Sequence, residues 1–169
     1  MRAPRPVRFS RSSPTDLRRI VGQVDKPEAI MQGDLDEGTP SEAVRMAQQF
    51  VAMVQRSTGT VLQYDPRSLV SVDEIVDDIK ATGLSEEDAS GMIYAVGCYV
   101  GEVLVRNAGG KWRQTSDLGI EASCGWPIVV VLPDGSGCNP IGKAFRRFRN
   151  GVTDSLAFFW YSTDDLPVH

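Results

Sequence analysis

Two ionisable residues four positions apart in an apolar segment are the feature of this chain most suited to chemistry. Glu102 lies within an apolar run that extends from about Gly91 to Val105, and Arg106 follows directly after it. On a helix, residues with this spacing share a face and can form an ion pair. A buried pair would tie the helix to its neighbours, whereas a pair lining a cleft could bind a ligand. We expect the structural role, and keep a cleft beside Trp112 as the alternative.

The residue inventory argues against several enzyme mechanisms. The single histidine is His169, the last residue, whereas a Ser-His-Asp or Cys-His mechanism needs an oriented imidazole. Cys98, Cys124 and Cys138 lack the spacing of metal ligands. The glycine-rich turns at 108–110 and 134–137 lack the spacing of a phosphate-binding loop. We therefore expect no catalytic residues, no metal and no cofactor, and the sequence favours a protein that is not an enzyme.

The charge is distributed unevenly along the chain. Residues 1–26 carry a net charge of +5 and the remainder −9, which together make the overall −4. The first segment interleaves arginines with prolines and cannot bury a core. We expect residues 1–38 to form a basic, disordered tail and linker, followed by a single domain over 39–165. An acidic domain repels polyanions, so a nucleic-acid partner is not expected.

The sequence also bears on location. No apolar run is long enough to cross a bilayer, and the N-terminal residues contain no apolar segment typical of a secretory signal. The three cysteines are an odd number and are expected to be reduced thiols. These observations predict a cytoplasmic protein without a membrane partner.

Three helices are expected in the first part of the domain. Thr39-Pro40-Ser41-Glu42 matches a helix start, and the apolar spacing continues to about Ser57. A second helix follows Asp65-Pro66 and ends at Gly83. A third runs from Ser85 to about Asn107 and is the most apolar, so we expect it to be central. Its glycines at 97 and 101 indicate a close crossing within the molecule.

The period of the apolar pattern changes after Gly110. We expect strands at 112–114, 118–123 and 127–132, and a further short strand at 60–64. A helix begins after Asn139-Pro140 and ends at Gly151, and 155–162 forms a last helix or a strand. The fold class is therefore α+β, with N-terminal helices packed on a small, mostly antiparallel sheet and one or two C-terminal helices.

Charged and aromatic residues elsewhere suggest binding surfaces. Acidic residues of the second helix are expected largely outside its inner face, where they would suit a basic partner. The basic cluster at 143–149 is expected to pair with the acidic second and third helices, or with an acidic protein. Trp126 lies in a turn and could anchor an interface. The candidate binding residues are Glu102, Arg106, Asn107, Trp112, Trp126, Asp73, Glu74, Asp77 and Asp78.

One motif resembles the signature of an uncharacterised bacterial domain family. It reads Gly97-x-Tyr-x-Gly-Glu102, followed by Arg106-Asn-x-Gly-Gly-x-Trp112. The later segments Asn139-Pro-Ile-Gly-Lys-Ala-Phe145 and Asp154-Ser-Leu156 are similar to the same pattern, so the resemblance covers residues 60–162. It implies a bacterial protein in which this helix ends at a glycine stop and leads to a tryptophan and strands. It implies no catalytic residue, because the activity of the family is not established.

These observations support two functional hypotheses. The first is a non-enzymatic domain that binds another protein, such as a toxin-neutralising immunity protein or a regulatory subunit. The alternative is a small-molecule-binding protein or hydrolase with a cleft near Glu102, Arg106 and Trp112. The identity of the partner and the oligomeric state are left open by the sequence.

Overall fold

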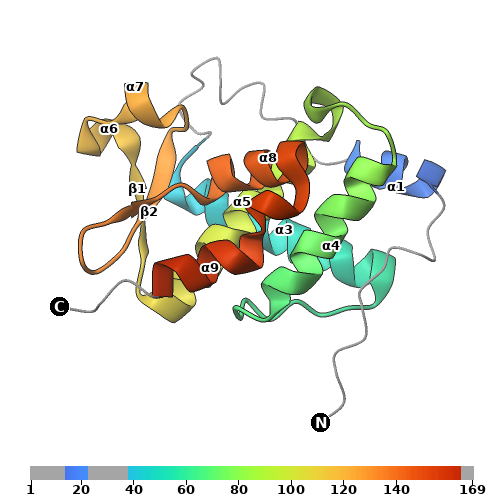
Figure 1. Cartoon of the computed structure of the whole chain (residues 1–169), viewed down its shortest axis with the longest axis horizontal. Helices are drawn as coiled ribbons and strands as arrows, with labels where there is room; N and C mark the ends of the chain where they lie inside the picture. The colour runs from blue at the N-terminus through green and yellow to red at the C-terminus, as the bar shows by residue number, and fades with distance from the viewer. Residues whose placement is uncertain (1–13, 23–37, 165–169) are drawn as a thin grey trace, which may run out of the picture.

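One apolar helix, α5 (Glu86–Ala108), forms the centre of the molecule (Figure 1). The computed structural model describes residues 14–22 and 38–164. Every residue of α5 from Gly91 to Leu104 is buried. The Ser85 hydroxyl caps the helix by accepting the N–H of Asp88, and Gly109 ends it in the left-handed conformation (φ 68°). The predicted central helix is confirmed, with its end one residue later than expected.

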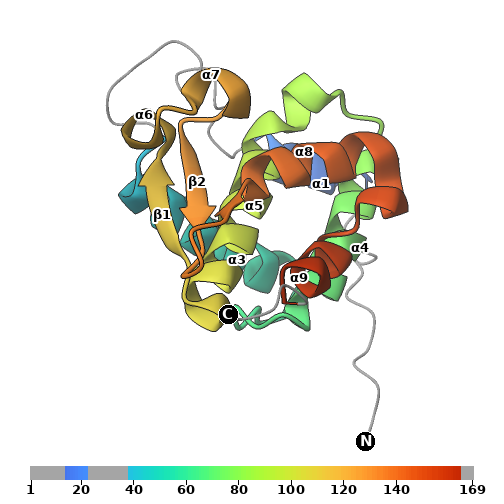
Figure 2. The ribbon, with the colours of Figure 1, turned by 60° about the vertical axis from the view of Figure 1, so that its left-hand side comes forward.

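Five further helices of the described residues surround α5. Helices α3 (Pro40–Thr58) and α8 (Pro140–Asn150) flank it most extensively, as Figure 2 shows. Helices α4 (Ser68–Ala81), α9 (Leu156–Asp164) and α1 (Pro14–Val21) complete the helical part. Cap and stop residues at the predicted positions define α3 and α8: Thr39 and Asn139 accept backbone N–H groups at their starts, and Gly59 and Gly151 follow their ends.

The two glycines of α5 permit the close crossings that their spacing predicts. A Cβ atom at Gly97 would lie 2.6 Å from the Cα of Ile141, which is backbone of α8. A Cβ at Gly101 would lie 2.1 Å from Cζ2 of Trp112. Both separations are shorter than van der Waals contact, so any side chain at either position would push a neighbour away. The intramolecular role of these glycines is therefore confirmed.

A small antiparallel sheet packs at one end of the helices (Figures 1 and 2). Its order is β1 (Lys111–Gln114), β2 (Ile128–Val131) and β3 (Gly137–Cys138). Trp112 lies opposite Val130, and both side chains enter the core that the sheet shares with α5. The α+β fold class is confirmed, although the helices make up most of the molecule.

Two predicted strands are wrong. Residues 118–123 do not pair with the sheet but form two single helical turns, α6 (Thr115–Leu118) and α7 (Glu121–Cys124). Gly119 ends α6 in the left-handed conformation (φ 66°), and Leu118 is 42% exposed, so the apolar spacing there does not mark a buried strand. Residues 60–64 form a loop instead of a strand.

The expected tail is wrong for residues 14–22. Leu17 and Val21 of α1 are buried against the core. Arg18 donates from Nε (3.0 Å) and Nη2 (2.6 Å) to the carbonyl of Thr82, just after the end of α4. A helix of eight residues is held here by tertiary contacts that its composition does not reveal. Residues 1–13 and 23–37 lie outside the described part of the chain.

The last element, α9, is a helix and not the strand that the sequence left open as the alternative for residues 155–162. Leu156 and Trp160 lie four residues apart and are buried on its inner side. In the part of the chain that the structure describes, no helix has both the length and the apolar character needed to span a bilayer.

Candidate functional site

The Glu102 carboxylate connects α5 with the sheet. Its side chain is only 5% exposed, and each of its oxygens accepts a hydrogen bond. Oε1 accepts from the Trp112 indole Nε1 at 3.0 Å, and Oε2 from Nε of Arg106 at 3.3 Å. The predicted i, i+4 pair is thus present, and a second donor from β1 shares the carboxylate. Burial of a carboxylate is tolerated because its charge is paired and hydrogen-bonded.

Arg106 lies at the border between this buried contact and the surface. Its side chain is 45% exposed, and Cζ lies 3.7 Å from the centroid of the Tyr64 ring. A guanidinium at this distance over an aromatic face is attracted by the ring quadrupole. The neighbouring Asn107 donates from Nδ2 to the carbonyl of Tyr64 at 2.7 Å. The structure therefore links Trp112 to Arg106 through Glu102, and places Arg106 and Asn107 against Tyr64, a residue that the sequence did not mark as a site residue.

That residue, Tyr64, is held in an unusual conformation in the loop between α3 and α4. Among the described residues it is the one non-glycine with positive φ, at 57°. Its N–H donates to the Tyr99 hydroxyl at 3.0 Å, and the two rings stack at 4.9 Å. The Tyr99 hydroxyl is also 2.6 Å from the Ser68 hydroxyl. No local sequence signal marks Tyr64, because every one of these partners belongs to another element.

The environment perturbs both tyrosines. Burial raises the pKa of Tyr64, and the nearby Arg106 charge partly opposes this change. Burial likewise raises the pKa of Tyr99 to about 12, with opposing contributions from its hydrogen bonds to Ser68 and Tyr64. Both phenols are therefore neutral at physiological pH.

The chemistry available to this cluster is limited. A general base needs a lone pair that faces the proton to be removed, and both Glu102 oxygens already accept internal hydrogen bonds. Burial also raises the pKa of the Cys98 thiol, which keeps it protonated and unreactive. Within residues 14–22 and 38–164, no group of acidic, cysteine or histidine side chains is arranged to hold a metal ion. The geometry suits orientation and binding better than proton transfer.

One of the four acidic residues that the sequence predicts to lie on the outer side of α4 lies in the core instead. Asp73 is buried and accepts Nε of Arg147 at 2.7 Å. It also accepts the N–H groups of Leu156 (2.9 Å) and Ala157 (3.2 Å) and the hydroxyl of Ser155 (2.8 Å) at the start of α9. The expected outward position of Asp73 is therefore wrong, because the buried Arg147 guanidinium and the N–H groups at the start of α9 both need an acceptor there.

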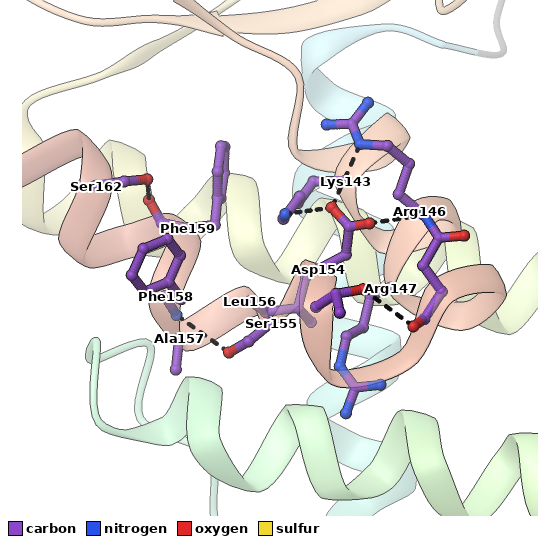
Figure 3. A network of polar contacts seen from close by, with 12 residues as sticks. Lys143, Arg146, Arg147, Asp154, Ser155, Leu156, Ala157, Phe158, Phe159 and Ser162 are labelled. Atoms are coloured by element: carbon purple, nitrogen blue, oxygen red, sulfur yellow. Dashed lines mark hydrogen bonds and ion pairs between the residues drawn. The ribbon is translucent and has the colours of Figure 1, made fainter.

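The basic residues of α8 have partners within the domain. Arg147 Nη1 donates to Asp77 at 2.8 Å, and Arg149 pairs with Glu86 at the start of α5. The prediction that this cluster pairs with the second and third helices is confirmed for Arg147 and Arg149 but not for Lys143 and Arg146. Figure 3 shows Lys143 and Arg146 directed at the Asp154 carboxylate. Nζ of Lys143 lies 2.6 Å and Nε of Arg146 lies 3.8 Å from Oδ1 of Asp154. Glu74 and Asp78 are half-buried on α4.

Trp126 is half-buried and packs inside its own domain. Its ring lies 4.9 Å from that of Phe145 and 6.1 Å from that of Tyr94. Thr115 donates from Oγ1 to the Trp126 carbonyl at 2.9 Å, which holds the turn before β2. Trp126 therefore has an evident packing role, and its predicted role as an interface anchor stays a prediction.

Apolar exposure is concentrated elsewhere, on α9 and the turn before it. Phe158 is 69% exposed and Tyr161 is 56% exposed, and their spacing of three places them on one side of the helix. Val152, in the preceding 3-10 turn η1 (Gly151–Asp154), is 79% exposed. We call Phe158 and Tyr161 the α9 face. The apolar run at 156–161, with aromatic residues from 158 onward, was the sequence signal for this face. A helix that is apolar on all sides exposes some of its apolar side chains unless other elements surround it.

Comparisons of the chain with protein-family models, with curated proteins and with solved structures found no match. The resemblance to an uncharacterised bacterial domain family therefore stays a prediction.

Proposed function

We propose that this chain is a non-enzymatic domain that binds another protein, as a toxin-neutralising immunity protein or a regulatory subunit of the bacterial cytoplasm does. The observation that carries the proposal is the α9 face, where Phe158 and Tyr161 are both more than half exposed. Aromatic side chains are enriched in interface cores and dominate their binding energy. Covering one such ring completely is worth roughly 1.5–3 kcal/mol.

The polar residues support the same proposal. Glu102 and Asp73, the two buried acids of the described residues, each accept hydrogen bonds from internal donors at both carboxylate oxygens. A carboxylate that serves as a general base must have an oxygen directed at the substrate, so the contacts of these two acids give no support to the hydrolase alternative. The proposal also does not depend on a basic partner, because Asp73 and Asp77 already pair with Arg147.

Site-specific photo-crosslinking in the producing cell tests the proposal. A benzophenone amino acid is placed at Phe158, and in a matched variant at Val61, a loop residue that is 54% exposed. We expect a discrete adduct from position 158 that is absent from position 61, with the partner identified by mass spectrometry. A third variant carries the crosslinker at Tyr161 together with Phe158→Ser. Its adduct should decrease, because half of the aromatic contact is lost.

The contrary result is equally clear. If position 158 gives no adduct beyond that at position 61, or if the adduct at 161 persists unchanged in Phe158→Ser, the α9 face is not a binding surface. Thermal unfolding of the Phe158→Ser protein serves as the control, because an exposed side chain contributes little to stability.

A further inference from the structure

The guanidinium of Arg106 has an edge, formed by Nη1 and Nη2, that has no hydrogen-bond partner among the described residues. Nε donates to Glu102, and the flat side of the group covers the Tyr64 ring. Among the described residues, neither Nη1 nor Nη2 of Arg106 forms a hydrogen bond, and the side chain is 45% exposed. Two NH₂ groups of one rigid, half-exposed side chain are therefore left for an external acceptor.

The orientation of this edge is determined by its surroundings. Glu102 cannot rotate freely, because Trp112 holds its other oxygen. Below the guanidinium, the Tyr64 backbone is held at φ 57° by the Tyr99 hydroxyl and by Asn107. This conformation costs a non-glycine residue about 1–2 kcal/mol. An ion pair within one helix does not require it, since residues at i and i+4 meet in any case. Local strain of this kind is concentrated at functional sites.

The geometry and charge of the edge select the ligand. Nη1 and Nη2 present parallel N–H groups that match the two oxygens of a carboxylate. Glu102 lies 3.3 Å from Nε and compensates much of the positive charge. A phosphate could accept both hydrogen bonds as well, but the Glu102 charge repels a dianion twice as strongly as it repels a monoanion, so the site favours a carboxylate. Because the arginine is already held in place, less side-chain freedom is lost on binding.

We propose that the Nη1–Nη2 edge of Arg106 is a binding site for a carboxylate, supplied either by a small acid or by an acidic side chain of a partner. Glu102 and Tyr64 act as positioning residues for this site. The inference does not use the α9 face, so the crosslinking result at Phe158 neither supports nor removes it.

Side-chain NMR of the full-length, ¹⁵N-labelled protein tests the proposal. The Nε–Hε signals of Arg106 and of Arg67, an exposed arginine in the α3–α4 loop, are followed during titration with sodium acetate. Sodium chloride at matched ionic strength provides the baseline. We expect a saturable shift at Arg106 and only the chloride-like drift at Arg67. Acetyl-glutamyl-amide forms a second arm, and tighter saturation by it than by acetate would identify a protein side chain as the source.

A variant with unchanged charge supplies an independent readout. The Trp112 indole signal reports on the site, because this N–H donates to Glu102. In Arg106→Lys the saturable response of Trp112 should be lost, whereas the control Arg67→Lys should retain it. Equal, unsaturable responses at Arg106 and Arg67 of the unmodified protein would overturn the proposal, whether or not the lysine variant folds. So would a stronger response to sodium phosphate than to acetate, or saturation that survives in Arg106→Lys.

Discussion

Replacing Asp73 by asparagine tests the attachment of α9, because one carboxylate serves two elements at once. In the unmodified protein it accepts Nε of Arg147 and the first backbone N–H groups of α9, at Leu156 and Ala157. Asparagine has nearly the same shape but no charge, and one of its two acceptors becomes an NH₂ donor. That donor would face other donors, so the substitution removes attraction and adds repulsion without opening a cavity.

The expected loss in the free energy of unfolding follows from the Arg147 charge that remains buried after the substitution. The Arg147 side chain is 3% exposed and would keep Asp77 as its one ion-pair partner, whose own side chain is 60% exposed. It would also keep its hydrogen bond from Nη2 to the backbone carbonyl of residue 73, at 3.2 Å. Removing one partner of a buried ion pair costs about 3–5 kcal/mol, and loss of a helix cap typically about 1 kcal/mol. Because the asparagine can still accept through its amide oxygen, we expect a loss near the lower end, about 3 kcal/mol. Against a typical domain stability of about 5–15 kcal/mol, this is a large fraction.

Urea unfolding followed by far-UV circular dichroism measures the effect. For an m value of about 2 kcal/mol/M, the midpoint should fall by roughly 1.5 M with little change in slope. The matched control is Glu74→Gln, which removes a charge at the next position of α4. Its side chain forms no hydrogen bond within the described part of the chain, so the change in stability should be less than about 0.5 kcal/mol.

Two results would refute the reasoning. One is a midpoint for Asp73→Asn that coincides with that of Glu74→Gln. The other is strict additivity in the cycle of Asp73→Asn with Arg147→Met, since residues in direct contact should couple and the double variant should recover part of the loss.

Two other predictions concern the core. Gly97→Ala should destabilise the protein by about 1–3 kcal/mol although alanine is the better helix former, because its Cβ would meet the Ile141 backbone at 2.6 Å; an unchanged or higher melting temperature would contradict the close crossing. The raised pKa of Tyr99 means that the folded protein keeps a proton which the unfolded chain loses near pH 10, so the free energy of unfolding should fall as pH rises from about 10 to about 12. Urea titrations across this range should show a shallower fall for Tyr99→Phe, and an identical fall would exclude Tyr99 as its origin.

Much of the helical framework follows from local signals. Thr39, Ser85 and Asn139 occupy cap positions, and Gly109 and Gly151 follow the helices they were predicted to end. Caps and stops act within one helical turn, so they are encoded by adjacent residues. The Glu102–Arg106 contact is likewise local, because helix geometry alone brings these side chains together.

The environment of the candidate site did not follow from the sequence. Tyr64 approaches Tyr99 across 35 positions of the chain, and Asn107 reaches its carbonyl across 43. The local pattern predicted a strand for residues 60–64, where the structure has a loop. The prediction failed because the local pattern carries no information about the partners that these residues meet in other helices.

Helix ends, the central apolar helix and its small-residue crossing were thus determined by the sequence alone, since each depends on neighbours within a few residues or on a missing side chain. Which charges are buried was decided only by the tertiary structure. The sequence pattern places Asp73 on the surface. In the structure it is buried against the Arg147 guanidinium of α8 and the first N–H groups of α9, which are 74 and 83 positions away along the chain. The free energy of a charge depends on the groups that surround it in space, and those groups meet only when the chain has folded.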